Sequence, residues 1–182
     1  MAWVTLMINL KKPVLTTPVG NAIHPWVSNA DVQFHPEGKF HTKLECEQNE
    51  CAKIIKAISD EIEAKSNEQQ KLDANKKITY ANKPYEITAD GKCVFKLQTK
   101  FRPTILDNKL KPLADDVKIF GGSKLRITFE AFGYNMPVGI GCSLRMKQVQ
   151  VLELVTGTLG DALGDLKVEP DVQPKIKQEI SL

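Results

Sequence analysis

Residues 92–103 read KCVFKLQTKFRP, and this stretch decides the fold that the sequence predicts. Apolar residues alternate with polar ones along it, and the polar positions include the cations Lys96, Lys100 and Arg102. Alternation with a period of two is typical of a strand with one buried face and one face in solvent. We therefore expect the cations outside and assign the phenylalanines of such inward faces to the core: Phe40, Phe95, Phe101 and Phe129.

The residues upstream of this strand predict two further hairpin elements. Asp90-Gly91 is a strong hairpin turn signal that follows the short extended run 85–88. Residues 39–46 alternate in the same way, and Val32–Phe34 precedes them as a hairpin partner. Prolines and glycines between residues 13 and 38 exclude a helix there.

One helix is predicted, from Glu50 to about Lys71, with Asn49 as its N-cap. Its apolar residues recur at helical spacing and form one stripe, which consists of Cys51, Ile54, Ile55, Ile58 and Ile62. We expect the i,i+4 pairs Lys56–Asp60 and Glu61–Lys65 on the wet side. The polar residues 66–77 are interpreted as a frayed end or a mobile loop.

The residues downstream of the first strand predict further strands of a small barrel or sandwich. Turns are expected at Asp107-Asn108 and Gly121-Gly122, a strand over 124–132, a loop over 133–141 and a long strand over 141–155. The fold class is therefore mainly β with one long α-helix. A closed barrel would also remove most free strand edges.

The charge of the chain is concentrated in its middle. The net charge is +3, but residues 76–147 hold 14 Lys or Arg against 6 Asp or Glu, whereas residues 1–75 and 148–182 are mildly acidic. A basic body of this kind is typical of a protein that binds a polyanion. The alternative is that the lysines only keep a β-rich surface soluble.

Several classes of protein are disfavoured by the sequence. No run of about 18 apolar residues occurs, so a membrane span is not expected. The four scattered cysteines fit reduced thiols in a cytosolic compartment. No nucleophile, nucleotide-binding or metalloprotease motif is present, so we do not expect an enzyme. His24, His35, His41, Cys46 and Cys51 are possible zinc ligands, but the ligands of structural zinc sites are usually paired more tightly in sequence. Neither a metal nor a cofactor is therefore predicted.

Cations and aromatic rings on neighbouring strands are the strongest functional signal. Proteins that bind single-stranded nucleic acid without sequence preference combine a basic groove along the phosphates with rings that stack on the bases. We expect such a groove to be continuous and to contain the following DNA-binding residues: Lys96, Lys100, Arg102, Lys124, Arg126, Tyr134, Phe132, Arg145, Lys147 and Tyr85. Tyr134, in the predicted loop, is the best candidate for an exposed stacking ring.

With these elements in place, the chain resembles phage-encoded single-stranded DNA-binding proteins of the OB-fold type. The resemblance rests on a helix after the first hairpin and on a strand that ends in Arg-Pro and an aspartate turn, residues 95–107. A Gly-Gly turn then opens the next strand (119–129), and an aromatic-Gly-Tyr segment (131–134) leads into a Gly-rich strand that ends near a glutamine (138–150). The resemblance covers Pro13 to Val155.

The resemblance implies an OB-fold-like DNA-binding domain over residues 13–155. It does not explain the N-terminal extension (1–12), and the glycines and prolines of the last residues predict a flexible C-terminal tail (156–182). It also implies a protein that coats unpaired DNA during phage replication, recombination or repair, in the host cell cytoplasm. The implied partners are single-stranded DNA and replication enzymes such as a polymerase or a helicase. The chain departs from the family at its end, which has no acidic run.

Two questions stay open at this stage. The apolar N-terminal residues Trp3, Val4 and Leu6 pack on the barrel, pair with a second subunit to give a homodimer, or arise from an upstream start codon. The alternative function is a structural or assembly protein of a virion that uses the same barrel for protein contacts.

Overall fold

The computed structural model of the chain describes residues 12 and 14–156. The predicted N-terminal extension (1–12) and C-terminal tail (156–182) therefore lie almost entirely outside the described residues, and so does the question raised by Trp3.

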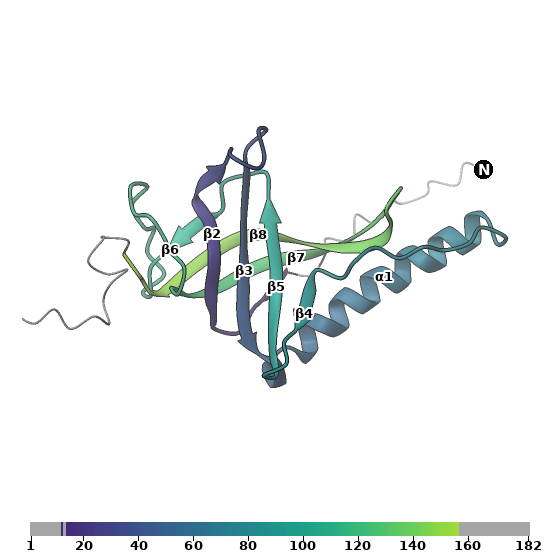
Figure 1. Cartoon of the computed structure of the whole chain (residues 1–182), viewed down its shortest axis with the longest axis horizontal. Coiled ribbons are helices and arrows are strands. Elements are labelled where there is room, and N and C mark those ends of the chain that lie inside the picture. Colours follow the sequence, from purple (N-terminus) through teal and green to yellow (C-terminus); the bar gives the residue numbers. More distant parts are fainter. Residues whose placement is uncertain (1–11, 13, 157–182) are drawn as a thin grey trace, which may run out of the picture.

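The centre of the fold is a closed ring of five strands (Figure 1). These strands are β2 (Gly20–Asp31), β3 (Lys39–Glu47), β5 (Lys92–Thr99), β7 (Lys124–Met136) and β8 (Gly139–Glu153). They pair in the order β7–β2–β3–β5–β8–β7, antiparallel except for β5 with β8. Outside the ring, β1 (Val14–Thr16) pairs with β7, β4 (Tyr85–Ile87) with β5 and β6 (Thr104–Leu106) with β8. A small barrel of five strands is the OB-fold architecture, which confirms the predicted fold class.

The interior of the ring is filled by the side chains that the period-two pattern assigned to it. Phe95, Phe129 and Leu44 are fully buried, and Phe40 packs partly against the same core. The assignment of Phe101 to the core is wrong, because its side chain is 82% exposed. β5 ends at Thr99, and the Thr99 Oγ1 accepts the N–H of Phe101 at 3.2 Å, so the chain bends before the alternation can continue.

The helix α1 (Ala52–Leu72) follows a short 3-10 turn (Gln48–Glu50). Ile54 and Ile58 are buried, as the predicted stripe requires. The predicted cap is wrong, since Cys51 is the N-cap residue and no side chain caps the helix. The Lys56–Asp60 pair forms at 2.7 Å, but the pair of Glu61 with Lys65 does not: Glu61 contacts Lys12, and Lys65 contacts Glu68 at 2.7 Å.

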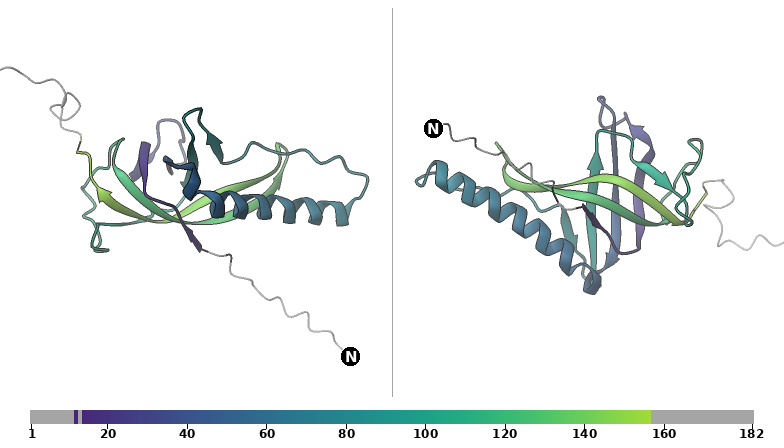
Figure 2. Two further views of the ribbon diagram at one scale, coloured as in Figure 1. Left: turned by 90° about the horizontal axis from the view of Figure 1, so that it is seen from below. Right: turned by 180° about the vertical axis from the view of Figure 1, so that it is seen from behind.

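The C-terminal half of the helix is better ordered than predicted, because this polar half packs on the rest of the chain. Ser66 Oγ lies 3.1 Å from Tyr80 Oη, and the Asn135 side-chain amide donates to Gln69 Oε1 at 2.7 Å. The helix runs beside the projecting β7–β8 hairpin, as Figure 2 shows from below and from behind. The prediction of a frayed end after Ser66 is therefore wrong. No helix among the described residues is long and apolar enough to cross a membrane.

Two further strand predictions need correction. Residues 133–141 are not a loop, because β7 and β8 continue through them and turn only at Pro137-Val138. The strand that precedes β3 is β2, and Val32–Phe34 lies in the turn that follows it. β2 accommodates its proline through a register shift between Ile23 and Trp26, where His24 has a φ of 47°.

Candidate nucleic-acid interface

Two lysines face each other on the outer surface of β3 and β5. Lys43 and Lys96 are directly opposite in the antiparallel register, and both are exposed. Neither forms an ion pair within the described part of the chain. Like charges directly opposite each other destabilise a sheet. This pair therefore lowers the stability of the isolated barrel but supplies two cations ready for an anion.

A polar row crosses the same outer surface one step along the strands. Trp26 of β2 lies opposite His41 of β3, His41 lies opposite Gln98 of β5, and Gln98 lies beside Arg145 of β8. We call the surface of Trp26, His41, Lys43, Lys96 and Gln98 the basic face. In Figure 1 this face of β2, β3 and β5 is turned toward the viewer, and the helix leaves it uncovered.

A hollow of about 400 Å³ adjoins the basic face at Trp26. It lies between β2 and the loop before β7, and Trp26, Lys118 and Phe120 are among its lining residues. Ser28 also lines it, and the buried Ser28 hydroxyl has no hydrogen-bond partner among the described residues. The aromatic rings could stack on a base, the lysine could contact a phosphate, and the hydroxyl without a partner could form a hydrogen bond with the base.

At the end of β5 the basic face continues into a segment of predicted site residues. Lys100 and Arg102 are exposed there, on either side of the exposed ring of Phe101. Lys100 has no ion pair in the described residues, whereas Arg102 pairs with Asp115 at 3.1 Å. Sequence reasoning missed Phe101 because the strand pattern placed it inside.

A second group of predicted residues lies on the outer side of the β7–β8 hairpin. The guanidinium of Arg145 stacks on the Phe132 ring at 3.5 Å, and Lys12 lies 4.7 Å from the same ring. Lys147 pairs with Glu130 at 3.1 Å. The Phe132 ring is therefore covered by two cations, and Lys147 is already paired with a carboxylate.

Tyr134 belongs to the same hairpin and lies in a strand rather than in an exposed loop. Its side chain is only half exposed, because the ring lies over Gly141: a Cβ at that glycine would come within 2.6 Å of Tyr134 Cζ. Tyr134 also lines a hollow of about 320 Å³ between the hairpin and the helix.

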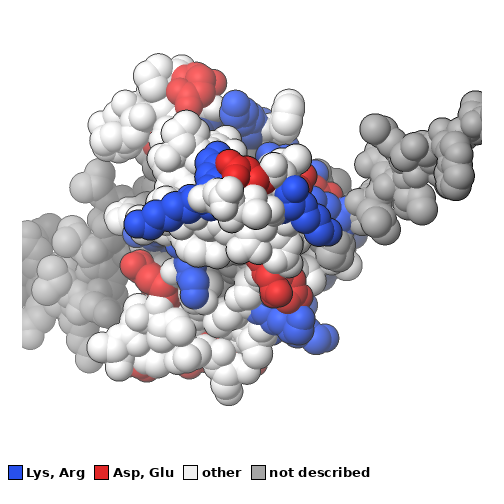
Figure 3. Space-filling model, turned by 90° about the vertical axis from the view of Figure 1, so that its right-hand side faces the viewer, with Lys and Arg blue, Asp and Glu red and all other residues white. Residues whose placement is uncertain are grey.

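The remaining predicted residues are not brought to the basic face. Lys124 and Arg126 lie at the start of β7, which β2 on one side and β8 on the other separate from β3 and β5. Tyr85 packs against the core, with its ring centroid 6.2 Å from that of Phe95. The expected single continuous groove is thus split into separate groups. On the end of the molecule that Figure 3 shows, Lys and Arg are interspersed with Asp and Glu.

The cysteines do not offer a nucleophile. All four are free and buried. Burial raises the pKa of Cys46 and of Cys93 to about 12 and that of Cys142 to about 11, and it raises the pKa of Cys51 as well. A thiol is reactive only as its thiolate.

A closed five-stranded ring with a helix between its second and third strands, and with one face that the helix leaves uncovered, defines an OB-fold barrel. The fold matches gp2.5, a single-stranded DNA-binding protein encoded by bacteriophage T7, with a TM-score of 0.71 and 24% identity over 89% of this chain and 98% of that one. It also matches the single-stranded DNA-binding protein from bacteriophage Enc34 in complex with single-stranded DNA, with a TM-score of 0.59 and 14% identity over 79% and 88% of the two chains. No protein-family model and no curated protein sequence matches the chain.

Proposed function

We propose that this chain is a phage single-stranded DNA-binding protein that coats unpaired DNA without strong sequence preference. The observation that carries the proposal is the uncovered basic face, where Lys43 and Lys96 lie opposite each other beside Trp26. The shared fold supports it, since the structures matched above are those of single-stranded DNA-binding proteins by their names.

The proposed binding mode combines phosphate contacts with stacking. Lys43, Lys96 and Lys100 follow the backbone, while Trp26 and Phe101 stack on bases, at about 1–3 kcal/mol for each ring. Of the residues predicted from the sequence, Lys96, Lys100 and Arg102 belong to this path. Arg145, beside Gln98, extends it toward the β7–β8 hairpin, where Phe132, Tyr134 and Lys147 form its outer part. Lys124, Arg126 and Tyr85 are left out of the path.

Fluorescence anisotropy with labelled oligonucleotides tests this proposal on the full chain. We expect a single strand to bind more tightly than the matching duplex, with a logarithm of affinity that falls linearly with the logarithm of salt concentration. The double variant Lys43→Ala/Lys96→Ala removes two phosphate contacts, so its salt slope falls by about 1.4, twice the roughly 0.7 expected per contact on single strands.

The matched control is Lys53→Ala/Lys56→Ala, which removes two exposed lysines from α1 and changes the net charge by the same amount. It should keep the wild-type slope. Equal loss of slope in the two double variants, or equal affinity for single strands and duplex, contradicts the proposed face.

The second candidate function is a virion structural or assembly protein that uses the barrel for protein contacts. The observation that favours it is the β7–β8 hairpin, which projects from the ring and ends in exposed Met136 and Val138. Light scattering separates the two functions. An assembly protein forms discrete oligomers that added oligonucleotide does not change.

The proposed function places the protein in the host cell cytoplasm, where phage DNA is replicated, recombined and repaired. Replication enzymes such as a polymerase or a helicase are proposed partners. A second copy of the chain, in a homodimer, is a further proposed partner.

A further inference from the structure

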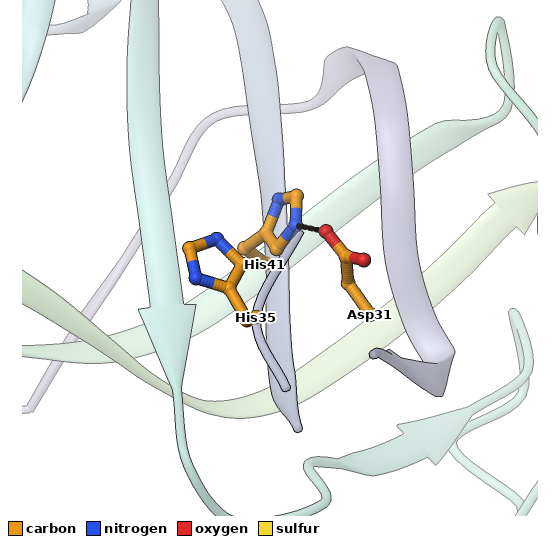
Figure 4. A group of neighbouring side chains, drawn as sticks. All are labelled: Asp31, His35 and His41. Carbon is orange, nitrogen blue, oxygen red and sulfur yellow. Dashed lines mark hydrogen bonds and ion pairs between the residues drawn. The ribbon is translucent and has the colours of Figure 1, made fainter. Parts of the chain in front are cut away.

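Three side chains with metal-binding atoms meet at the end of the basic face where β2 turns into β3. Figure 4 shows Asp31, at the end of β2, and His41, of β3, joined by a hydrogen bond, with His35 of the intervening turn beside them. One ligand atom from each residue lies within 4.8 Å of the other two. Sequence reasoning considered His35 and His41 as ligands together with cysteines, but the cysteines are buried in the core and Asp31 takes their place.

We propose that Asp31, His35 and His41 bind a zinc ion. Two imidazoles and one carboxylate are a ligand set that suits zinc and other first-row transition metals, whereas Mg²⁺ and Ca²⁺ prefer oxygen ligands alone. Three protein ligands leave one position of a tetrahedral zinc ion for water or another ligand. This inference does not depend on the proposed function, because it concerns a site that forms without DNA.

The pair of Asp31 and His41 needs only a small adjustment to hold the ion, while the third ligand atom, from His35, has to come closer than the present limit of 4.8 Å. His41 Nε2 donates to Asp31 Oδ2 at 2.9 Å. Two ligand atoms on a tetrahedral zinc, each about 2.0–2.1 Å from it, lie about 3.3 Å apart. Zinc would thus take the place of the proton between these atoms, with an opening of a few tenths of an ångström. The ring of His35 already meets that of His41 edge-on, with centroids 5.5 Å apart.

The carboxylate is already oriented in the way that metal ligands usually are. Asp31 is 1% exposed, and its other oxygen, Oδ1, accepts the backbone N–H groups of Gln33 and Phe34, each at 3.0 Å. Such outer contacts fix a ligand and typically affect metal affinity 10–100-fold.

The experiment is a zinc titration of the full chain after dialysis against a chelator, followed by calorimetry and thermal unfolding. We expect one zinc ion per chain and a zinc-dependent rise in Tm. His35→Ala should weaken binding at least about tenfold, since it removes a ligand and not merely an outer contact. Because His35 lies in a turn and is only half-buried, the Tm of the His35→Ala variant without zinc should equal that of the wild type.

Asp31→Asn provides the second variant, because the amide keeps an oxygen for Gln33 and Phe34 but loses the charge. It should also lose the zinc-dependent rise in Tm. The control is His24→Asn, which removes the histidine outside the cluster and tolerates the positive φ at that position. It should bind zinc as the wild type does.

Cobalt(II) in place of zinc identifies the donor atoms. We expect visible bands of a tetrahedral site without the near-ultraviolet band of sulfur bound to cobalt. A sulfur band would place the ion on the buried cysteines and overturn the proposal. So would undiminished zinc binding by His35→Ala, or no zinc-dependent change in the Tm of the wild type.

Discussion

At the scale of single residues, Phe101 is the position where the alternating pattern of the sequence and the structure disagree. The pattern of the strand places the Phe101 ring in the core, but the ring is exposed and lies between two exposed cations, where it is free to stack on a base. The structure thus changes the ring that we expect to matter most from Tyr134 to Phe101.

Replacing Phe101 by alanine should weaken single-stranded DNA binding by about 1–3 kcal/mol, the contribution of one stacked base. The unfolding midpoint should not change, because the side chain makes no part of the core. Phe101→Trp keeps a stacking ring and should restore the affinity in the same anisotropy titration. Loss of affinity in both variants would show that the ring does not act by stacking.

Asp31 makes stability depend on pH even without a metal. Its folded-state pKa is lowered below the ordinary value of 3.8, mainly by its hydrogen bond with His41 against the opposing effect of burial. A lowered pKa stabilises the fold at pH values above 3.8, and the stabilisation is lost as pH falls through the folded-state value.

We therefore expect Asp31→Asn to be less stable than the wild type at neutral pH, and the difference to shrink as pH falls from about 5 to 2. Chemical unfolding at a series of pH values, with a chelator present, measures this difference. A difference that is constant over that range would mean that the charge of Asp31 does not stabilise the fold.

The candidate site could be predicted from the sequence only in part, for a reason that Lys96 and Arg126 illustrate. The period-two pattern predicts correctly that both side chains point outward. In a closed ring, however, outward positions on strands that are not neighbours face different directions. The ring closure that separates β5 from the start of β7 is a long-range property. Local alternation therefore predicts which residues face solvent but not which ones share a surface.

At the scale of elements, the glycines of the β7–β8 hairpin were interpreted as loop residues, yet they lie in strands. Gly133 is there because α1 passes close by: a Cβ on it would lie 2.8 Å from the backbone oxygen of Glu61. Its N–H also donates to Glu61 Oε2 at 3.0 Å. Glycine in a strand often marks such a close approach, which no local pattern reveals.

Gly133→Ala should therefore force the helix away from the hairpin and destabilise the protein by about 1–3 kcal/mol, as overpacking does. Gly121→Ala is the control, since the nearest atom to its added Cβ, the backbone oxygen of Ala22, is 3.8 Å away. Urea unfolding of both variants measures the change. If Gly121→Ala proved as destabilising as Gly133→Ala, the close approach would not be the cause.

Contacts with residues distant in sequence also explain why the C-terminal turns of the helix are ordered rather than frayed. Residues 66–72 have no apolar stripe, so the sequence suggests fraying. They remain helical because Ser66 and Gln69 form hydrogen bonds with Tyr80 and Asn135, residues distant in sequence. The apolar stripe of Ile54 and Ile58, by contrast, is a local signal and was predicted correctly.

At the scale of the whole molecule, the rate at which a reagent labels the four buried cysteines measures how the strand ring opens. Cys46 comes from β3, Cys51 from the start of the helix, Cys93 from β5 and Cys142 from β8, and each is at most 3% exposed. With a pKa of about 12, Cys46 and Cys93 hold on the order of one thiolate in ten thousand molecules at pH 8. A thiol reagent can reach these side chains only when the structure opens.

We expect no fast labelling of the native protein at pH 8 and full labelling of all four thiols in denaturant. The strands β3, β5 and β8 are consecutive in the closed ring, so the loss of any one of them exposes the core cysteines of the other two to solvent. The labelling rates of Cys46, Cys93 and Cys142 should therefore all equal the rate of one global opening. Mass spectrometry of a labelling time course gives the rate at each cysteine. A Cys142 that reacts much faster than Cys46 would show that the β8 side, next to the projecting hairpin, opens on its own, and that the ring does not unfold as one cooperative unit.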